Sequence, residues 1–181
     1  MRKRLSAQIY AREKQGVAGD FQELDGTLNA VLDGQISEIE RRIEQVIIQE
    51  ETLAKKARLL RSIPGIGPVS AAMLIAEMPE LGRMTAGEAA AMTGLAPVPR
   101  DSGTMRGKRV IAGGRRSLRQ VLFQAALAAA RHNPLLKPLA KRLKERGKPH
   151  KLIIIAIARK LVVTANALLK TATPWQSGHA A

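Results

Sequence analysis

The stretch from Pro97 to Arg116 gathers residue types that could react with a phosphodiester. It reads PVPRDSGTMRGKRVIAGGRR and places Ser102 between Asp101 and Gly103 in a basic loop. A serine hydroxyl can act as a nucleophile when a base removes its proton and cations neutralise the phosphoryl oxygens. Asp-Ser-Gly is equally typical of a plain turn, because Asp and Ser hydrogen-bond nearby backbone and Gly tolerates a positive φ. The residues alone leave both interpretations of Ser102 open.

The cations of this loop are candidates for binding phosphate oxygens. They cannot readily serve as the base, because they are cationic at neutral pH. Four glycines after Ser102 and the alternating KRVIA segment predict a flexible arm or a short β-ribbon. The loop therefore supplies, at most, half of an active site. Its candidate phosphate-binding residues are Arg100, Arg106, Lys108, Arg109, Arg115 and Arg116.

Charge divides the chain into two halves. Residues 1–99 carry 12 Lys and Arg against 13 Asp and Glu, a net −1, whereas residues 100–181 carry 18 against 2, a net +16. So much positive charge is costly in self-repulsion, which favours a polyanionic partner, nucleic acid before membrane. A basic face solvated by water is the alternative. The chain has no Cys, and its three His have no metal-ligand spacing, so no metal site is expected in it.

A helix-hairpin-helix pattern spans residues 59–78, LLRSIPGIGPVSAAMLIAEM. Gly65 and Gly67 permit a tight turn, and a second helix is expected to start at Pro68 or Val69. The free N–H groups of its first turn could bind a phosphate. Ile63, Ile66, Val69, Met73 and Leu74 are expected to fix the hairpin. The alternative is a helix corner that binds no ligand.

Apolar residues recur at spacings of three and four between residues 25 and 61. This period, with charged residues between, predicts a long amphipathic helix and coiled-coil dimerisation. A long helix packed on its own domain is the alternative. Polar residues at seam positions, Asn29 and Glu50, could set the register. The seam comprises Asn29, Leu32, Ile36, Ile39, Ile43, Val46, Glu50, Leu53, Ala57 and Leu60.

The other segments also have a helical pattern. A capping box at Thr85 to Glu88 opens a short helix that stops at Gly94, and three more helices are expected over 116–133, 134–147 and 149–170. The last is apolar nearly all round and is expected to be central, with Trp175 docked on the core. We predict an all-α fold in which a long coiled-coil helix precedes a compact helical domain containing the helix-hairpin-helix. At most a short β-hairpin is expected near residues 96–112.

The order of these motifs resembles the C-terminal domain of the RNA-guided transposases of insertion-sequence family one hundred and ten. The similar blocks are LRSIPGIGPVSAAMLIAEMPELG, AAMTGLAPVPRDSGTMRGKRVIAGGRRSLRQVLF and the segment from ARHNPLLKP to PW, within residues 59–175. Residues 20–58 resemble the family's coiled-coil linker. The resemblance divides the chain into a basic segment 1–19, the linker 20–58, the transposase domain 59–175 and a tail 176–181.

The resemblance implies DNA transposition with a serine nucleophile, guided by a structured RNA. The family's RDSG motif falls on Arg100 to Gly103, so Ser102 matches its catalytic serine. An acidic DEDD domain, which holds Mg²⁺ in the family, is expected to be missing, so the chain itself binds no cofactor. Expected partners are DNA, guide RNA and another protomer or full-length transposase, but no membrane.

Two other functions stay open. The chain could be an inert nucleic-acid-binding remnant or regulator of a full-length transposase. It could also be a coiled-coil protein whose basic half binds ribosomal or guide RNA. No signal peptide is evident. The most apolar run, at residues 152–158, is too short to span a bilayer and is followed by Arg159 and Lys160. We therefore expect a soluble, cytoplasmic, nucleoid-associated protein.

Overall fold

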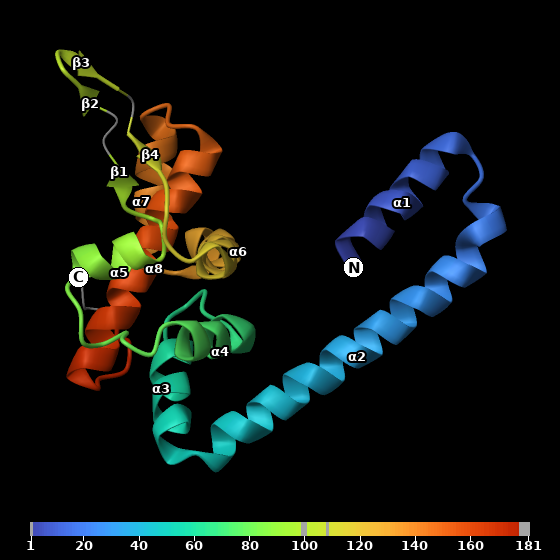
Figure 1. Cartoon of the computed structure of the whole chain (residues 1–181), viewed down its shortest axis with the longest axis horizontal. Helices are drawn as coiled ribbons and strands as arrows, with labels where there is room; N and C mark the ends of the chain where they lie inside the picture. The colour runs from blue at the N-terminus through green and yellow to red at the C-terminus, as the bar shows by residue number, and fades with distance from the viewer. Residues whose placement is uncertain (1, 99–100, 108, 178–181) are drawn as a thin grey trace. The chain divides into compact units, whose positions relative to one another are not determined.

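The computed structural model describes residues 2–98, 101–107 and 109–177, and helices dominate it (Figure 1). The all-α prediction with a short hairpin near residues 96–112 is confirmed. Two compact units divide at residues 46 and 47. The elements are α1 (Arg2–Gln15), the 3₁₀ helix η1 (Gly19–Phe21), α2 (Gln22–Gln49), α3 (Glu51–Arg61), α4 (Pro68–Glu77), α5 (Ala86–Met92), β1 (Pro97–Val98), β2 (Asp101–Ser102), β3 (Met105–Arg106), β4 (Val110–Ile111), α6 (Arg116–His132), α7 (Leu136–Glu145) and α8 (His150–Thr171).

The first unit, residues 1–46, consists of α1 and most of α2. Arg12 donates to both carboxylate oxygens of Asp25 at 2.6 and 2.7 Å, and its guanidinium lies 4.1 Å from the centre of the Phe21 ring. Because Asp25 is nearly buried, this charged pair replaces the water that its carboxylate would otherwise bind. The pair therefore ties α1 to the start of α2.

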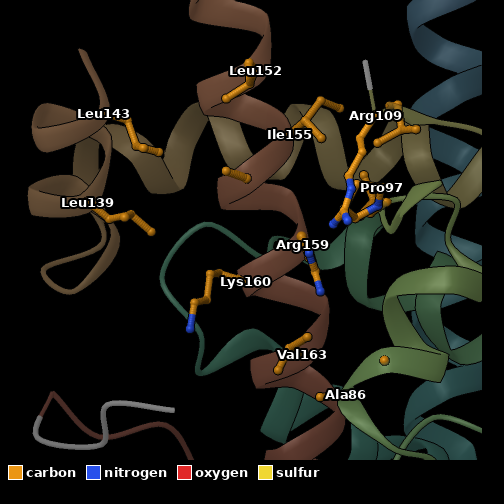
Figure 2. A pocket seen from close by; sticks show the side chains of 14 residues that line it. Ala86, Pro97, Arg109, Leu139, Leu143, Leu152, Ile155, Arg159, Lys160 and Val163 are labelled. Carbon is orange, nitrogen blue, oxygen red and sulfur yellow. The ribbon is translucent and has the colours of Figure 1, made fainter. Parts of the chain in front are cut away.

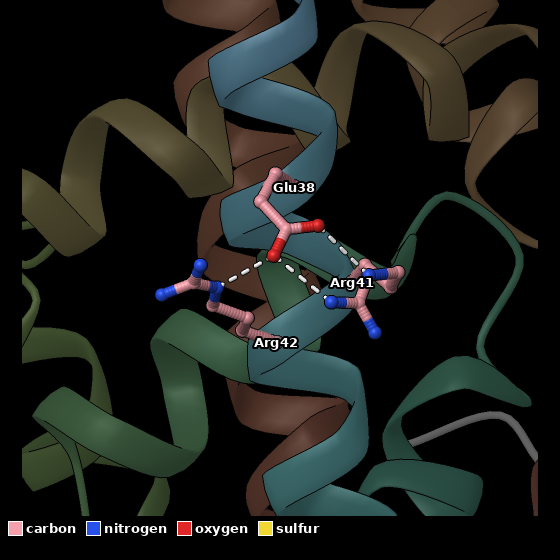
Figure 3. Close-up of polar contacts among 3 residues, drawn as sticks. All are labelled: Glu38, Arg41 and Arg42. Carbon is pink, nitrogen blue, oxygen red and sulfur yellow. Dashed lines mark hydrogen bonds and ion pairs between the residues drawn. The ribbon is translucent and has the colours of Figure 1, made fainter.

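Polar contacts also run along the surface of α2 (Figure 3). Glu38 accepts hydrogen bonds from Arg41 at 2.8 and 2.9 Å and from Arg42 at 2.7 Å. These bonds, Arg41 first, lower the pKa of Glu38 to about 2. Pairs three and four residues apart face each other on a helix and stabilise it modestly.

The apolar stripe of α2 is exposed within the first unit. Apolar side chains at seam positions of the expected coiled coil remain open to solvent, and their neighbours on the helix are charged. The exposed seam residues are Ile36, Ile39, Ile43 and Val46.

The single helix expected over 25–61 is interrupted at Glu50. This residue has φ −107° and ψ 113°, and its carboxylate accepts from the N–H groups of Thr52 and Leu53. The heptad pattern continues through a position that serves instead as the N-cap of α3. Beyond it, Ala57 and Leu60 are buried in the core of the second unit, so they do not extend the exposed seam.

The second unit, residues 47–181, is built around α8. α8 packs against α3, α5, α6 and α7, and Ile157, Leu161 and Val162 are fully buried, as expected for a central helix (Figure 1). It is long and apolar enough to cross a membrane by length and composition, but half of that apolar window is buried inside the protein, which is typical of a core helix. Trp175 docks on this core, and its backbone N–H donates to Ser62 Oγ at 2.8 Å.

Candidate nucleic-acid interface

Ser102 lies in a β arm that leaves the helical core between α5 and α6 (Figure 1). β1 pairs antiparallel with β4, and β2 pairs antiparallel with β3, so that Ser102 faces Met105 across a two-residue turn. Gly103 begins this turn with φ 56°, which suits the first central position of a type II′ hairpin turn. Among the described elements, β2 and β3 contact only each other. Ser102 is therefore presented close to the tip of the arm.

The base of the arm is a close crossing of backbone. Gly94, which follows α5, and Gly114, which precedes α6, have φ values of 66° and 65°. A Cβ on Gly114 would lie 2.1 Å from the Gly94 nitrogen, and the Arg115 N–H donates to the Met92 carbonyl at 2.8 Å. Of the two forms expected from the sequence, the structure has the β-ribbon. At the base of this ribbon, Gly114 lets its backbone approach that of Gly94 closely, because a side chain would not fit there.

The predicted phosphate-binding cations have different surroundings. Arg109 and Arg116 are exposed, whereas Arg115 forms an ion pair with Glu80 at 2.6 Å. The hydrogen bond from Arg115 lowers the pKa of Glu80, because it favours the charged form of this carboxylate. Part of the charge on Arg115 is thus neutralised within the protein. Arg106 lies in β3, the strand that follows the strand of Ser102. Arg100 and Lys108 lie outside the described residues.

The helix-hairpin-helix corner forms as predicted, with α4 starting at Pro68. Its two glycines have different roles. Gly65 has φ 110° and faces α6, where an added Cβ would lie 2.6 Å from the Cβ of Ala129. Gly67 precedes α4 with nothing within 4 Å of an added Cβ, and Pro68 and Val69 at the start of α4 are exposed. The prediction that Val69 fixes the hairpin is wrong, because its side chain is 51% exposed at the start of α4.

Asn133 is a structural residue that the sequence reasoning missed. Its buried side-chain amide donates to the Pro64 carbonyl at 3.0 Å, and its Oδ1 accepts from the N–H groups of Leu135 and Leu136 at 3.0 and 3.1 Å. It therefore holds both the hairpin turn and the turn that leads into α7. The signal was present in the sequence, because Asn followed by Pro favours the start of a turn.

An open groove of about 710 Å³ lies beside the base of the arm (Figure 2). Its floor is aliphatic, with Leu139 and Leu143 from α7 and Ile155 from α8. Cations from two elements line it: Arg109 comes from the arm, and Arg159 and Lys160 come from α8. No acidic residue is among the described lining residues. The groove joins the arm to the basic surface of the last two helices.

That surface consists of exposed Lys and Arg side chains. Glu145 is the acidic residue of this segment, and it lies 3.9 Å from Lys141. The exposed cations of α7, α8 and the turn between them are Lys137, Lys141, Arg142, Lys144, Arg146, Lys148, Lys151, Arg159, Lys160 and Lys170. Cations distributed in this way suit a polyanion whose charge repeats along its length.

A metal site needs several oxygen, nitrogen or sulfur donors close together. Among residues 2–98, 101–107 and 109–177, no three His, Cys, Asp or Glu side chains lie close enough together to hold a metal ion. The described part of the chain therefore does not fit a Mg²⁺ site, and no step of the chemistry is assigned to a metal in it.

A projecting arm, a helix-hairpin-helix corner and a basic helical surface together define a domain of the nucleic-acid-binding class. The model of the Transposase IS116/IS110/IS902 family matches residues 57–141. Over these residues the chain is therefore similar to the IS116/IS110/IS902 transposase family.

The chain is also similar to individual proteins. An uncharacterised 43.6 kDa protein of insertion element IS110 from Streptomyces coelicolor is 31% identical over 121 residues, which cover 66% of this chain and 30% of that protein. A pilin gene-inverting protein from Moraxella bovis is 32% identical over 144 residues, covering 77% of this chain and 45% of that protein. An uncharacterised 44.8 kDa protein of insertion element IS116 from Streptomyces clavuligerus is 33% identical over 147 residues, covering 77% and 34%. The chain thus spans less than half the length of these relatives.

Proposed function

We propose that this chain is the serine-bearing, DNA-binding part of a transposase that cuts and rejoins DNA through Ser102. The position of Ser102 near the tip of the β arm carries the proposal. A side chain buried in the core could not reach a DNA backbone, but one beside the turn of a projecting ribbon can. The family of residues 57–141 and the names of its relatives, which include a gene-inverting protein, support DNA recombination as the process.

The reaction is an exchange at phosphorus. Ser102 Oγ loses its proton to a base and bonds to the phosphorus, while the bond from phosphorus to one deoxyribose oxygen breaks. That oxygen keeps the electron pair and takes up a proton, so a phosphoserine link replaces the DNA link. Arg106, which pairs with Asp101 beside Ser102 in the β2–β3 ribbon, would stabilise negative charge on the phosphoryl oxygens, and Arg109 at the base of the arm would bind the DNA backbone elsewhere. They cannot act as the base, because a guanidinium does not deprotonate at neutral pH.

The base and the metal are assigned to another domain. An acidic DEDD domain that holds Mg²⁺ would supply both charge stabilisation and a route for the proton. It would have to be supplied in trans or by a longer protein. Guide RNA is the proposed source of sequence choice, since the basic surface suits phosphates without regard to sequence. We place this activity on DNA in the cytoplasm.

Self-association through α2 is part of the proposal. The exposed stripe that includes Ile36, Ile39 and Ile43 would be covered by the same stripe of another protomer. Two arms would then be held in one assembly.

A second function, nucleic-acid binding without chemistry, has one observation in its favour. Among the described residues, no three His, Cys, Asp or Glu side chains are close enough together to hold the metal that the chemistry would use. In that case the chain would dock DNA and regulate a full-length transposase.

A covalent adduct assay separates the two. This protein is mixed with full-length transposase whose own serine is replaced, together with guide RNA, labelled DNA and Mg²⁺. We expect a denaturation-resistant protein–DNA adduct on this chain, which is lost in Ser102→Ala and lost when the metal is chelated. DNA affinity of Ser102→Ala should stay near that of the unmodified protein, because one hydroxyl contributes only about 1 kcal/mol.

Thr104→Ala is the matched control, since it removes a hydroxyl two residues away, in the exposed turn that follows Ser102. It should retain the adduct. The proposal is wrong if Ser102→Ala forms the adduct as well as the unmodified protein. Persistent DNA binding with no adduct from either protein would favour the binding function.

A further inference from the structure

The base of the arm is held by a side chain as well as by glycines. The guanidinium Nη1 of Arg119, one turn into α6, donates to the Gly113 carbonyl at 2.6 Å. The same nitrogen would lie 2.2 Å from a Cβ on Gly94. Arg119 therefore sits over the point where the incoming and outgoing ends of the arm cross.

Neighbouring contacts connect this crossing to the core. The Arg115 N–H donates to the Met92 carbonyl at 2.8 Å, and the Arg115 guanidinium pairs with Glu80 at 2.6 Å. Ser117 Oγ donates to the carboxylate of Glu77, the last residue of α4. The start of α6 is thus tied to both α4 and α5, and Arg119 extends this connection to the outgoing end of the arm.

Few other contacts between the arm and the helical core could fix the direction of the arm. β2 and β3, which carry Ser102 and the turn, contact only each other among the described elements. Among the described residues, the β1–β4 pair and the crossing at its base are the parts of the arm that lie between these strands and the helical core. A small rotation at the base becomes a larger displacement at Ser102, because displacement grows with distance from the pivot.

We propose that Arg119 is a positioning residue that sets the direction of the β arm and so places Ser102 for attack. The inference rests on the proposed function of Ser102. It assigns to Arg119 a role different from that of the exposed cations, since its guanidinium binds a backbone carbonyl of the protein. Loss of that bond should matter because a misplacement of about 1 Å can cost roughly 100-fold in rate.

A distance measurement tests the orientation without any chemistry. The chain contains no Cys, so spin labels can be placed selectively at Thr104→Cys in the turn and Lys151→Cys on α8, both exposed positions. Pulsed electron paramagnetic resonance should give one defined range of distances between the two spin labels when Arg119 is present. We expect Arg119→Ala to broaden or shift this range and Arg119→Lys, which keeps a donor, to restore part of it.

Arg131→Ala is the control, because Arg131 is an exposed cation in the last turn of the same helix. It should leave the distance range unchanged. Should Arg119→Ala prove unfolded by circular dichroism, Arg119→Gln takes its place in both assays. An Arg119 variant that is folded and gives the same distance range as the parent protein overturns the inference.

The adduct assay gives a second readout. At saturating DNA, the single-turnover rate of adduct formation should fall about 10- to 100-fold in Arg119→Ala, with partial rescue by Arg119→Lys. DNA affinity should change no more than in Arg131→Ala. A weaker affinity with an unchanged rate at saturating DNA would make Arg119 a phosphate ligand and refute the positioning role. If the parent protein itself forms no adduct, the proposed function fails, and the distance measurement alone decides the role of Arg119.

Discussion

At the scale of single residues, the two glycines of the helix-hairpin-helix turn have separate roles. Gly65 combines φ 110° with a close approach to Ala129, so a side chain there meets both backbone strain and a packed neighbour. We expect Gly65→Ala to lower the free energy of unfolding by about 2 to 6 kcal/mol, the sum of the costs of a strained φ and of overpacking. Urea denaturation followed by circular dichroism measures this change.

Gly67→Ala is the control for that change. Gly67 has φ −87° with open space around it, so Ala should cost no more than about 1 kcal/mol, as for a less suitable N-cap. Equal losses from the two substitutions would show that packing of Gly65 on α6 does not stabilise the corner.

At the scale of single residues, the sequence predicts features with local requirements but not features that depend on remote contacts. The PGIG motif predicts the turn because its requirements are local. It does not distinguish Gly65 from Gly67, since the difference depends on Ala129, which is remote in sequence. The position of Ser102 beside a turn was likewise predictable from Asp-Ser-Gly, but the contact of Arg119 with Gly113 across the arm base was not.

At the scale of elements, prediction succeeded where local chemistry decides the boundary. The capping box of Thr85 and Glu88 forms as expected because its partners are three residues apart. The break at Glu50 was missed, because a heptad pattern reports apolar spacing and says little about a polar seam residue that caps the next helix. The tight crossing of Gly94 and Gly114 was also missed, since two segments about twenty residues apart in sequence create it.

The exposed stripe of α2 leads to a prediction about assembly. We expect the protein to sediment as a dimer or larger species at micromolar concentration, and the double substitution Ile39→Glu, Ile43→Glu to weaken association by at least about 100-fold. Two carboxylates at a buried seam would be costly to desolvate. Analytical ultracentrifugation over a concentration series measures the effect.

Ser37→Glu with Gln45→Glu provides the comparison on the same helix. It adds the same two charges at exposed polar positions away from the stripe, and the assembly should persist. A parent protein that is monomeric throughout the series would leave the stripe without a role in self-association.

At the scale of the whole molecule, charge separates the chain into two parts with different expected partners. The net charge is −1 over residues 1–99 and +16 over residues 100–181, so long-range attraction to a polyanion must come from the second part. The exposed apolar stripe lies on α2 in the first part. The first part of the chain thus provides a surface suited to protein contact, and the second part provides a surface suited to phosphates.

The salt dependence of DNA affinity tests this division of the chain most directly. Each phosphate neutralised by the protein releases condensed counterions, so the slope of log affinity against log salt reports the number of contacts. Replacing Arg106, Lys108 and Arg109 together with Ala should flatten the slope for duplex DNA by up to about three, as measured by fluorescence anisotropy at several salt concentrations. The matched variant removes three charges from the first unit, by Arg4→Ala, Arg41→Ala and Arg42→Ala, and should leave the slope nearly unchanged, the last two cations being paired with Glu38. An equal flattening by both triples would mean that net charge alone governs binding, and an unchanged slope in the first would show that the arm does not contact the DNA backbone.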